Sequence, residues 1–488
     1  MSIPPLTGLR TAARRIVDAH GRDVILRGAN VNSLAEYWAG RPDLPPVFAL
    51  ADEDWDKMAA YGFNVVRLLI SWSRVEPERG RYDLDYLDAV DAHVRAAAER
   101  GIYTVIDMHQ DVFSPHLATP DPAILPAGTT PARGWDGAPA WAVITDDETP
   151  MILDASQRAS NPAARRAWEH LYQDTHGIRA AFAEAWRTVA TYFAGRPEVA
   201  GYDVLNEPEN VWHASRTQPL YDALLAQCIR AIREAESGNP RSLIFIEPGL
   251  PCEETRNGVV HPSRAAFDGD PDGIVYAPHN YTESLPSPSV FGTRVEAFNA
   301  LLQRIGDDLG VPVWIGEYGV FAIDRDTIDA AWRYAADEDR RRWGGTWWVW
   351  RQSYGDPHRL VWSAGGWQPT PPDAVVRLHT TDAQTNEDVP TTPFLRVLGR
   401  AYPRATPGIL ALVESSRNGR LEVHAYDGVP GSRLDVWFPD RVGSVDVSGL
   451  TDVRFDADAT GQVVMATVVG DGPYRLTIVP ADSPVSPA

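Results

Sequence analysis

The feature that most constrains the fold is a regular alternation of apolar runs and amphipathic segments between residues 24 and 352. The apolar runs favour β-strands, and the segments between them carry apolar residues at helical spacing. Eight strands are expected, at residues 24–31, 64–70, 103–109, 202–208, 242–247, 273–279, 311–319 and 345–352. Helices are expected at residues 51–61, 84–100, 162–194, 218–236, 294–309 and 325–340. This alternation predicts a (β/α)8 TIM barrel.

The residues that end the apolar runs indicate where the chemistry lies, because barrel active sites form at the carboxyl ends of the strands. Three runs end in a glutamate, and two of these glutamates are candidates for catalysis. Tyr202–Pro208 carries Glu207 directly after Asn206, and proline then blocks further strand pairing. Val311–Gly319 carries Glu317 in the corresponding place. The sequence therefore predicts two carboxyl groups on one rim of the barrel.

A pair of carboxyl groups is what the hydrolysis of glycosidic bonds requires. We expect Glu207 to be the acid/base, beside an Asn206 amide that binds a sugar hydroxyl. Glu317 is then the nucleophile, kept ionised by donors such as Arg67 and a tyrosine hydroxyl. A separation of about 5 to 5.5 Å would give a retaining mechanism. The alternative for either glutamate is a capping or surface role.

Polar residues after the third and sixth strands extend this site. His109 and Asp111 follow an apolar run and suit hydrogen bonds to sugar hydroxyls. A metal role for this pair is the alternative, although its ligand spacing is weak. His279 and Tyr281 end the sixth strand, and Tyr281 is expected to donate to the nucleophile unless it is an ordinary buried tyrosine. No cofactor is expected.

Two tryptophans near the end of the eighth strand are candidates for the floor beneath a sugar ring. Strand alternation predicts that Trp348 and Trp350 point to the same side. The alternative is that either ring fills the barrel. Glu247 ends the fifth strand, and we interpret it as a structural ion-pair partner or hydrogen-bond acceptor.

Composition excludes several classes of partner. The formal net charge is −21, which argues against nucleic acid and against docking on an anionic membrane through charge. No apolar run has transmembrane length, so no stable membrane insertion is expected. Cys228 and Cys252 are expected to be unpaired thiols. We expect a monomer that either acts inside the cell or has lost a leader.

A change in the sequence pattern after about residue 402, to short apolar runs separated by Gly, Asp and Pro, divides the chain into domains. A barrel domain is expected at residues 1–402, a small C-terminal all-β sandwich at 405–482 and a tail at 483–488. The long stretch 110–162 interrupts the barrel pattern and is expected to be a lid or binding loop.

Together, Arg67, Asp107–Asp111, Asn206–Pro208, His279–Tyr281, Gly316–Gly319, Trp348 and Trp350 form a set that resembles glycoside hydrolase family 5. The segments 107–114 and 350–358 narrow the resemblance to the endoglycoceramidase branch, a barrel followed by a β-sandwich. The resemblance implies retaining hydrolysis of the β-linkage between a glycan and ceramide. It also implies that His109, Asp111, Asn206, Tyr281 and Trp348 or Trp350 line the sugar subsite.

The chain departs from this family pattern after the first strand, where the resemblance leads us to expect a lysine that touches the sugar. The segment 32–36 ends instead in Glu36 and contains no lysine. Galactose in place of glucose next to ceramide is one interpretation of this change. Apolar residues expected to hold the lipid are Phe113, Trp135, Trp141, Val211 and Trp212.

Two other hypotheses remain open from the sequence. One is a β-glucosidase or endoglucanase of the same family that acts on soluble glycans or on other lipid-linked β-glycosides. The other is a non-catalytic barrel that binds carbohydrate or lipid. Activity on cello-oligosaccharides without activity on glycolipid would favour the first, and any turnover would exclude the second.

Overall fold

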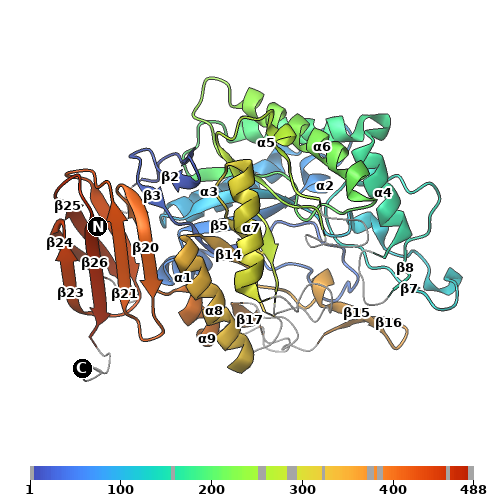
Figure 1. Cartoon of the computed structure of the whole chain (residues 1–488). Coiled ribbons are helices and arrows are strands. Elements are labelled where there is room, and N and C mark those ends of the chain that lie inside the picture. The colour runs from blue at the N-terminus through green and yellow to red at the C-terminus, as the bar shows by residue number, and fades with distance from the viewer. Residues whose placement is uncertain are drawn as a thin grey trace.

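The computed structural model describes residues 5–154, 160–250, 260–282, 294–320, 325–370, 378–381, 388–457 and 462–481. Cys252 and the predicted tail at 483–488 lie outside these residues. A barrel wrapped in helices forms one side of the molecule, and a sandwich of antiparallel strands forms the other (Figure 1). Cys228 is a buried free thiol, as predicted.

The barrel is a closed ring of parallel strands. Its strands are β4 (Arg27–Val31), β5 (Val65–Ser71), β6 (Tyr103–His109), β9 (Val199–Asp203), β10 (Leu243–Ile246), β11 (Ile274–Tyr276), β12 (His279–Asn280), β13 (Ile315–Tyr318) and β14 (Gly345–Trp347). They are ordered β11-β10-β9-β6-β5-β4-β14-β13-β12, and a parallel bridge between Tyr276 and Val313 closes the ring. β11 and β12 are two pieces of one predicted strand, separated at Ala277 and Pro278. The predicted TIM barrel is confirmed.

Helices cover the outside of the barrel because each buries an apolar face against the strands. They are α1 (Asp52–Ala60), α2 (Trp72–Val75), α3 (Leu84–Ala98), α4 (Pro162–Tyr172), α5 (Ile178–Tyr192), α6 (Ala214–Ala235), α7 (Val295–Leu309), α8 (Arg325–Arg341) and α9 (Thr392–Leu398). The prediction of one helix over 162–194 was wrong. Asp174, His176 and Gly177 have φ values of 57°, 53° and 72°, and these left-handed residues break the helix between α4 and α5.

Two predicted strands end earlier than expected. β9 stops at Asp203, four residues before Glu207. The carbonyls of Asn206 and Glu207 accept hydrogen bonds from the Gln110 side chain, at 2.8 and 3.0 Å, and Glu207 has a φ of 39°. β14 stops at Trp347, so residues 348–352 do not continue the strand.

The second body is a β-sandwich, as predicted, and it includes the start of the chain. The strands β1 (Arg10–Ala12), β2 (Arg15–Val17) and β3 (Asp23–Val24) join a seven-stranded sheet through β19 (Tyr402–Thr406). The rest of this sheet is β22 (Arg433–Phe438), β25 (Gln462–Val468) and β24 (Leu450–Ala457), and the opposing sheet contains β20 (Ile409–Ser415), β21 (Leu421–Tyr426), β26 (Tyr474–Pro480) and β23 (Val442–Ser448). The predicted boundaries at 402 and 405 stay a prediction.

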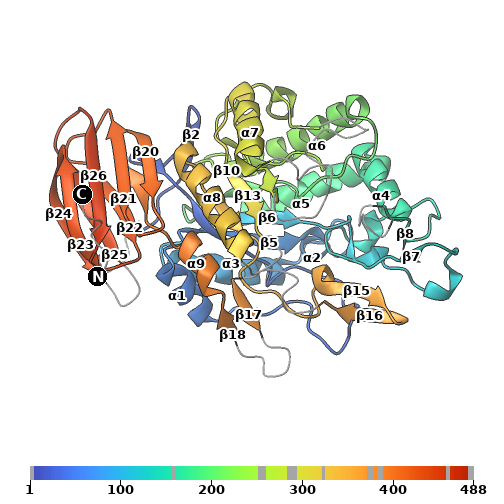
Figure 2. The ribbon, with the colours of Figure 1, turned by 60° about the horizontal axis from the view of Figure 1, so that its bottom comes forward.

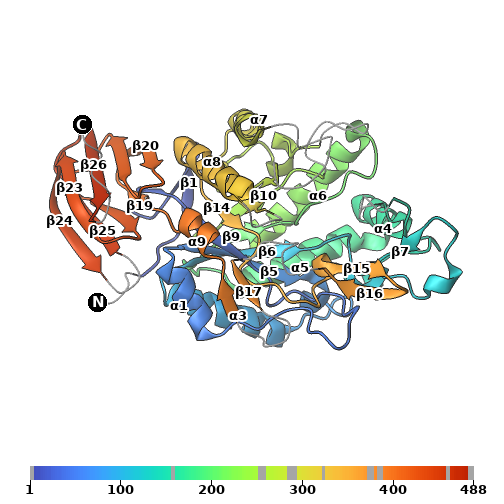
Figure 3. The same ribbon diagram turned by 90° about the horizontal axis from the view of Figure 1, so that it is seen from below.

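Loops with short elements extend the barrel on the side away from the sandwich. The stretch 110–162 contains three 3-10 turns and the short pair β7 (Thr130–Pro131) and β8 (Met151–Ile152) among its described residues. Next to it lies a hairpin of β15 (Leu360–Ser363) and β16 (Gly366–Pro369), which Figures 2 and 3 show beside β7. A second hairpin pairs β17 (His379–Thr381) with β18 (Asp388–Pro390). Within the described ranges, no helix combines the length and apolar character needed to cross a bilayer.

Candidate active site

A buried arginine stands at the centre of the strand ends. Arg67 on β5 has no exposed surface, and its guanidinium nitrogens lie 2.8 to 2.9 Å from carboxylate oxygens of Asp107, Asp203, Glu247 and Glu317. Burial lowers the pKa of Arg67, but the surrounding carboxylates outweigh it and hold the pKa well above its ordinary value. One permanent cation therefore contacts four acidic residues at or near the ends of four different strands.

Glu317 lies on β13 with both carboxylate oxygens occupied. Oε1 accepts a 2.8 Å hydrogen bond from Arg67, and Oε2 accepts one of 2.8 Å from the Tyr281 hydroxyl. These are the donors that the sequence predicted. Burial raises the pKa of Glu317, and the charges of His279 and Arg67 oppose that rise. The same burial, together with Glu317, raises the pKa of Tyr281 well above its usual value, so Tyr281 remains a donor.

Glu207 is held on the rim by backbone and side-chain contacts. Its N–H donates to Glu247 Oε2 at 2.8 Å, and its Oε1 lies 2.8 Å from His279 Nδ1. His279 Nε2 lies 3.2 Å from Glu247 Oε1. Glu247 is therefore the structural acceptor that the sequence indicated, because it fixes both the acid/base candidate and the histidine beside it.

The two candidate catalytic glutamates face one another across a short gap. A carboxylate oxygen of Glu207, one of Glu317 and a ring nitrogen of His279 all lie within 4.8 Å of each other. Burial lowers the pKa of His279, but Glu247 and Glu317 outweigh it and raise that pKa well above the ordinary value. The site thus combines two close carboxyl groups with an imidazole whose pKa is held above its ordinary value.

Asn206 and the third-strand residues form the neighbouring wall. The Asn206 side chain accepts from Arg67 at 2.9 Å and donates to the Gln110 carbonyl at 2.9 Å. His109 Nδ1 lies 2.7 Å from Asp107 Oδ2, and its ring stacks on Trp348 with centroids 5.4 Å apart and planes 14° apart. Trp348 therefore reaches the site.

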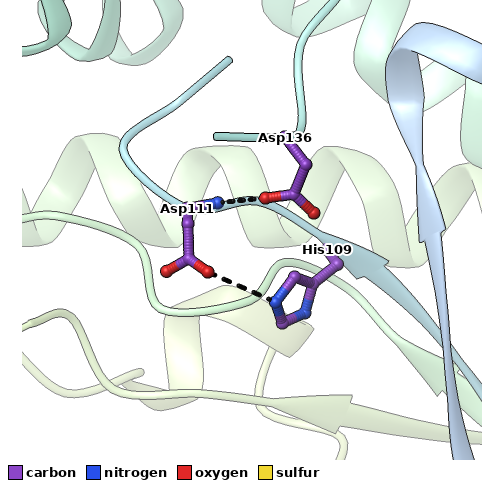
Figure 4. A group of neighbouring side chains, drawn as sticks. All are labelled: His109, Asp111 and Asp136. Atoms are coloured by element: carbon purple, nitrogen blue, oxygen red, sulfur yellow. Dashed lines mark hydrogen bonds and ion pairs between the residues drawn. The ribbon is translucent and has the colours of Figure 1, made fainter. Parts of the chain in front are cut away.

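Asp111 and Asp136 meet beside His109 (Figure 4). The Asp111 N–H donates to Asp136 Oδ1 at 2.8 Å, and Asp111 Oδ2 lies 3.7 Å from His109 Nε2. Burial raises the pKa of Asp136 to about 7, although His109 opposes that rise. No local pattern in the sequence pointed to Asp136, which comes from the middle of the long loop 110–162.

His358 was also missed as a site residue. Its Nε2 lies 2.8 Å from Asp111 Oδ2, and its Nδ1 lies 2.7 Å from Asp356 Oδ1. Burial lowers the pKa of His358, whereas Asp356 and Asp111 outweigh it and raise the pKa to about 10. His358 lies within the segment 350–358 that was singled out as specific, but its spacing alone assigns no role.

Trp350 does not enter the site. It is fully buried against Tyr61 and Phe63, at centroid distances of 6.3 Å, and its Nε1 donates to Asp54 at 3.0 Å. The prediction that Trp348 and Trp350 share a side was wrong, because β14 ends at Trp347 and strand alternation no longer applies.

Glu36 lies in the loop after β4, between two residues that pack with Trp348. Its N–H donates to Ser71 Oγ at 2.9 Å, and its neighbours Ala35 and Tyr37 pack in the cluster that contains Trp348. The Glu36 side chain is half-buried. The chain's single lysine, Lys57, instead lines a groove between the barrel and the sandwich.

The residues expected to hold a lipid divide into two groups. Phe113 and Trp135 are buried, and Trp141 packs edge-on against Trp72 at 5.3 Å, so these rings form a second layer over the barrel rim. Trp212, which follows Glu207 along the chain, is only half-buried and lies under the Arg216 guanidinium at 3.8 Å. Trp212 remains a lipid-binding candidate.

Three groups of acidic and histidine side chains have the spacing of metal ligands. They are His109 with Asp111 and Asp136, Glu207 with His279 and Glu317, and Asp107 with Asp203 and Glu247. Arg67 contacts all three members of the last group, and a histidine with a raised pKa stands in each of the others. Each group therefore has an arginine, or a histidine with a raised pKa, within it or in contact with it.

Comparisons with known proteins agree with this geometry. The family model described as Cellulase (glycosyl hydrolase family 5) matches residues 17–354. A crystal structure of an endogalactoceramidase has a TM-score of 0.86 at 32% identity, covering 97% of this chain and 100% of that chain. Endo-glycoceramidase II from Rhodococcus sp., in a ganglioside GM3 complex, has a TM-score of 0.72 at 25% identity, covering 96% of this chain and 100% of that chain.

A curated relative at the sequence level is Endoglycoceramidase I of Rhodococcus hoagii (strain 103S), 28% identical over 295 residues. The match covers 57% of this chain and 53% of the relative, so the chain spans about half the length of that protein. The family model covers well over half of the chain, and it contains both glutamates, Arg67 and Trp348. The chain therefore belongs to glycosyl hydrolase family 5, a family of glycosidases.

Proposed function

We propose that this chain is a retaining, endo-acting glycosidase that cleaves the β-linkage between the glycan and the ceramide of glycosphingolipids. The observation that carries the retaining mechanism is the approach of Glu207 and Glu317 oxygens to within 4.8 Å. Inverting enzymes keep their carboxyl groups about 6.5 to 9.5 Å apart, to leave room for a water molecule. The gap here suits direct attack by a carboxylate.

In the first step, a Glu317 oxygen attacks the anomeric carbon, and the bond to the ceramide oxygen breaks as Glu207 protonates that oxygen. Arg67 and Tyr281 orient Glu317 for this attack. In the second step, Glu207 removes a proton from water, which attacks the anomeric carbon and releases Glu317. Glu207 must donate a proton in the first step and accept one in the second. The contact with His279 holds the carboxyl group of Glu207 in position for both steps.

The substrate assignment is supported by the relatives. Proteins named endoglycoceramidase are similar to this chain in sequence. The solved structure of an endo-glycoceramidase in complex with ganglioside GM3 matches nearly the whole of this chain. The half-buried Trp212 beyond Glu207 offers an apolar surface on the side where ceramide would leave.

We further propose galactose as the sugar joined to ceramide. Glu36 occupies the rim where the family resemblance implies a lysine, and a carboxylate accepts hydrogen bonds that an ammonium cannot accept. The endogalactoceramidase structure has a TM-score of 0.86, against 0.72 for the ganglioside-bound endo-glycoceramidase II. A site that pairs with particular hydroxyls discriminates strongly between epimers.

The test is product analysis by mass spectrometry on galactose-linked and glucose-linked ceramide glycans, with cello-oligosaccharides as the soluble comparison. Release of intact glycan and ceramide, faster for the galactose-linked substrate, is the expected result. A 2-deoxy-2-fluoro glycoside should leave a stable mass increase on the peptide containing Glu317. Turnover of cello-oligosaccharides alone would overturn the ceramide assignment, and a product of inverted configuration would overturn the mechanism.

A further inference from the structure

A pair of tryptophans stands on the β15–β16 hairpin. Trp362 and Trp367 are cross-strand partners, so their side chains share one face of the hairpin. Their rings meet edge-on with centroids 5.3 Å apart, and both side chains are half-exposed. Trp38, from the loop after β4, meets Trp367 edge-on, also at 5.3 Å. We call Trp38, Trp362 and Trp367 the tryptophan platform.

The hairpin is fixed to the barrel rim, which a two-stranded ribbon needs because it is marginally stable alone. The Arg133 guanidinium, from the loop 110–162, donates to the carbonyls of Pro357 and Leu360. Arg359 donates to the Thr370 carbonyl at 2.8 Å across the base of the hairpin. The platform is therefore a pre-formed surface.

Aromatic contacts connect the platform with the catalytic site. The Trp348 ring beside His109 lies 5.2 Å from the ring of His358, which in turn lies 4.9 Å from the ring of Trp135. The Trp135 carbonyl accepts a 2.7 Å hydrogen bond from the Trp38 N–H. The sugar floor and the platform are thus parts of one continuous packed wall.

The direction of this wall follows from the barrel. Glu207 comes after the fourth strand, and Trp348 comes after the eighth, so they lie on opposite sides of an eight-stranded ring. An acid that protonates the leaving oxygen lies on the side of the leaving group. The loops after β4 and β14, which carry the platform, therefore extend on the side of the retained glycan.

We propose that the tryptophan platform is a distal glycan subsite, which binds sugar residues of the oligosaccharide that lie beyond the one at the cleaved bond. This inference rests on the endo-acting function proposed above. Half-exposed indole rings suit contact with the C–H faces of sugar rings. The adjacent Arg41 guanidinium donates to the Trp367 carbonyl at 3.3 Å and pairs with Asp43 at 2.5 Å. This exposed ion pair supplies hydrogen-bond donors and acceptors for the hydroxyl groups of a sugar. A lipid chain would leave those donors and acceptors without partners.

The test compares kcat/KM on two ceramide substrates that differ only in glycan length, one with a single sugar and one with an oligosaccharide. Trp362→Ala and Trp367→Ala should each lower the ratio of long to short substrate by about 5- to 10-fold. Trp362→Phe keeps a ring and should recover most of the loss. Trp332→Ala, which removes a half-buried tryptophan in the groove near the sandwich, should leave the ratio unchanged.

A second measurement separates this inference from the proposed function. Calorimetry of Glu317→Gln with the free oligosaccharide should give a Kd about 10-fold weaker when Trp367→Ala is added, whether or not ceramide is the natural aglycone. An unchanged Kd together with an unchanged long-to-short ratio would overturn the subsite. A third outcome would also overturn the subsite. If Trp362→Ala or Trp367→Ala no longer cosedimented with neutral phosphatidylcholine vesicles, while its long-to-short ratio of kcat/KM stayed unchanged, the platform would be assigned to a lipid surface.

Discussion

His358 Nε2 lies 2.8 Å from Asp111 Oδ2, and this contact fixes the orientation of a carboxylate beside His109 in the candidate site. Asp356 holds the other ring nitrogen at 2.7 Å, so the imidazole is clamped between two carboxylates. Because the pKa of His358 is raised to about 10, the ring is cationic at neutral pH. A loop residue outside the strand ends thus positions a residue on the strand end.

We predict that His358→Gln raises KM about 10-fold with a smaller change in kcat. Asp111 loses a hydrogen bond to a charged partner, and such a bond contributes about 1.5 to 3 kcal/mol. Steady-state kinetics on the galactose-linked substrate would measure this. His170→Gln, which alters a histidine on α4 that pairs with Asp146, is the matched control. A fall in kcat at constant KM would contradict a positioning role.

The same histidine predicts a pH dependence of stability. Its pKa of about 10 in the folded protein exceeds that of a free imidazole, about 6.5, so the folded state binds the proton more tightly. The stabilisation is complete below pH 6.5 and is lost as the pH rises toward 10. Urea denaturation from pH 6 to pH 10 should show this decline in wild type and a shallower one in His358→Gln. Parallel curves would contradict the charge assignment.

The roles of the two glutamates can be separated by the leaving group. Glu317→Gln should lose turnover on every substrate. Glu207→Gln should lower kcat about 10²- to 10⁴-fold on glycolipid. It should still be glycosylated rapidly by an aryl glycoside with an acidic phenol, which leaves without a proton, and azide should then restore turnover as a glycosyl azide.

Glu184→Gln, an exposed change on α5, is the control for this pair and should behave as wild type. Rescue of Glu317→Gln by azide with retained configuration would reverse the assignment of nucleophile and acid/base.

The barrel and its central residues could be predicted because they are encoded locally. Apolar runs form the strands, and polar residues follow the runs at the rim of the barrel. This pattern alone predicted that Glu207, Glu317, His109 and Tyr281 lie together, without any knowledge of tertiary contacts. Arg67 was expected to touch one carboxylate, whereas it contacts four.

The remaining features depend on contacts between distant segments. Asp136 and His358 reach Asp111 from two loops whose paths no periodicity describes. The pairing of β3 with β19 joins residues 23–24 to residues 405–406. No pattern in either segment predicts that it pairs with the other. Trp350 was misplaced because alternation was extended past the end of β14.

Arg67→Lys should destabilise the fold by about 3 to 5 kcal/mol, because one ammonium cannot reach four buried carboxylates and leaves several without a hydrogen-bond donor. Urea denaturation would measure the loss. The deficit should narrow as the pH falls and those carboxylates become protonated. Arg81→Lys, a change in an exposed ion pair with Glu78, is the control. A loss below about 1 kcal/mol would contradict the central role of Arg67.

Glu36→Lys should shift the proposed sugar preference from galactose toward glucose, because a donor replaces an acceptor in the loop after β4. We expect the ratio of kcat/KM for galactose-linked over glucose-linked ceramide to fall at least 10-fold. Glu36→Gln keeps the size and an acceptor oxygen while removing the charge, and its ratio should lie between the two. Thermal unfolding of each variant would show whether the rim loop is intact. A ratio that stays the same in both variants would remove Glu36 from sugar recognition, and the choice between the two sugars would then have to come from another residue at the site.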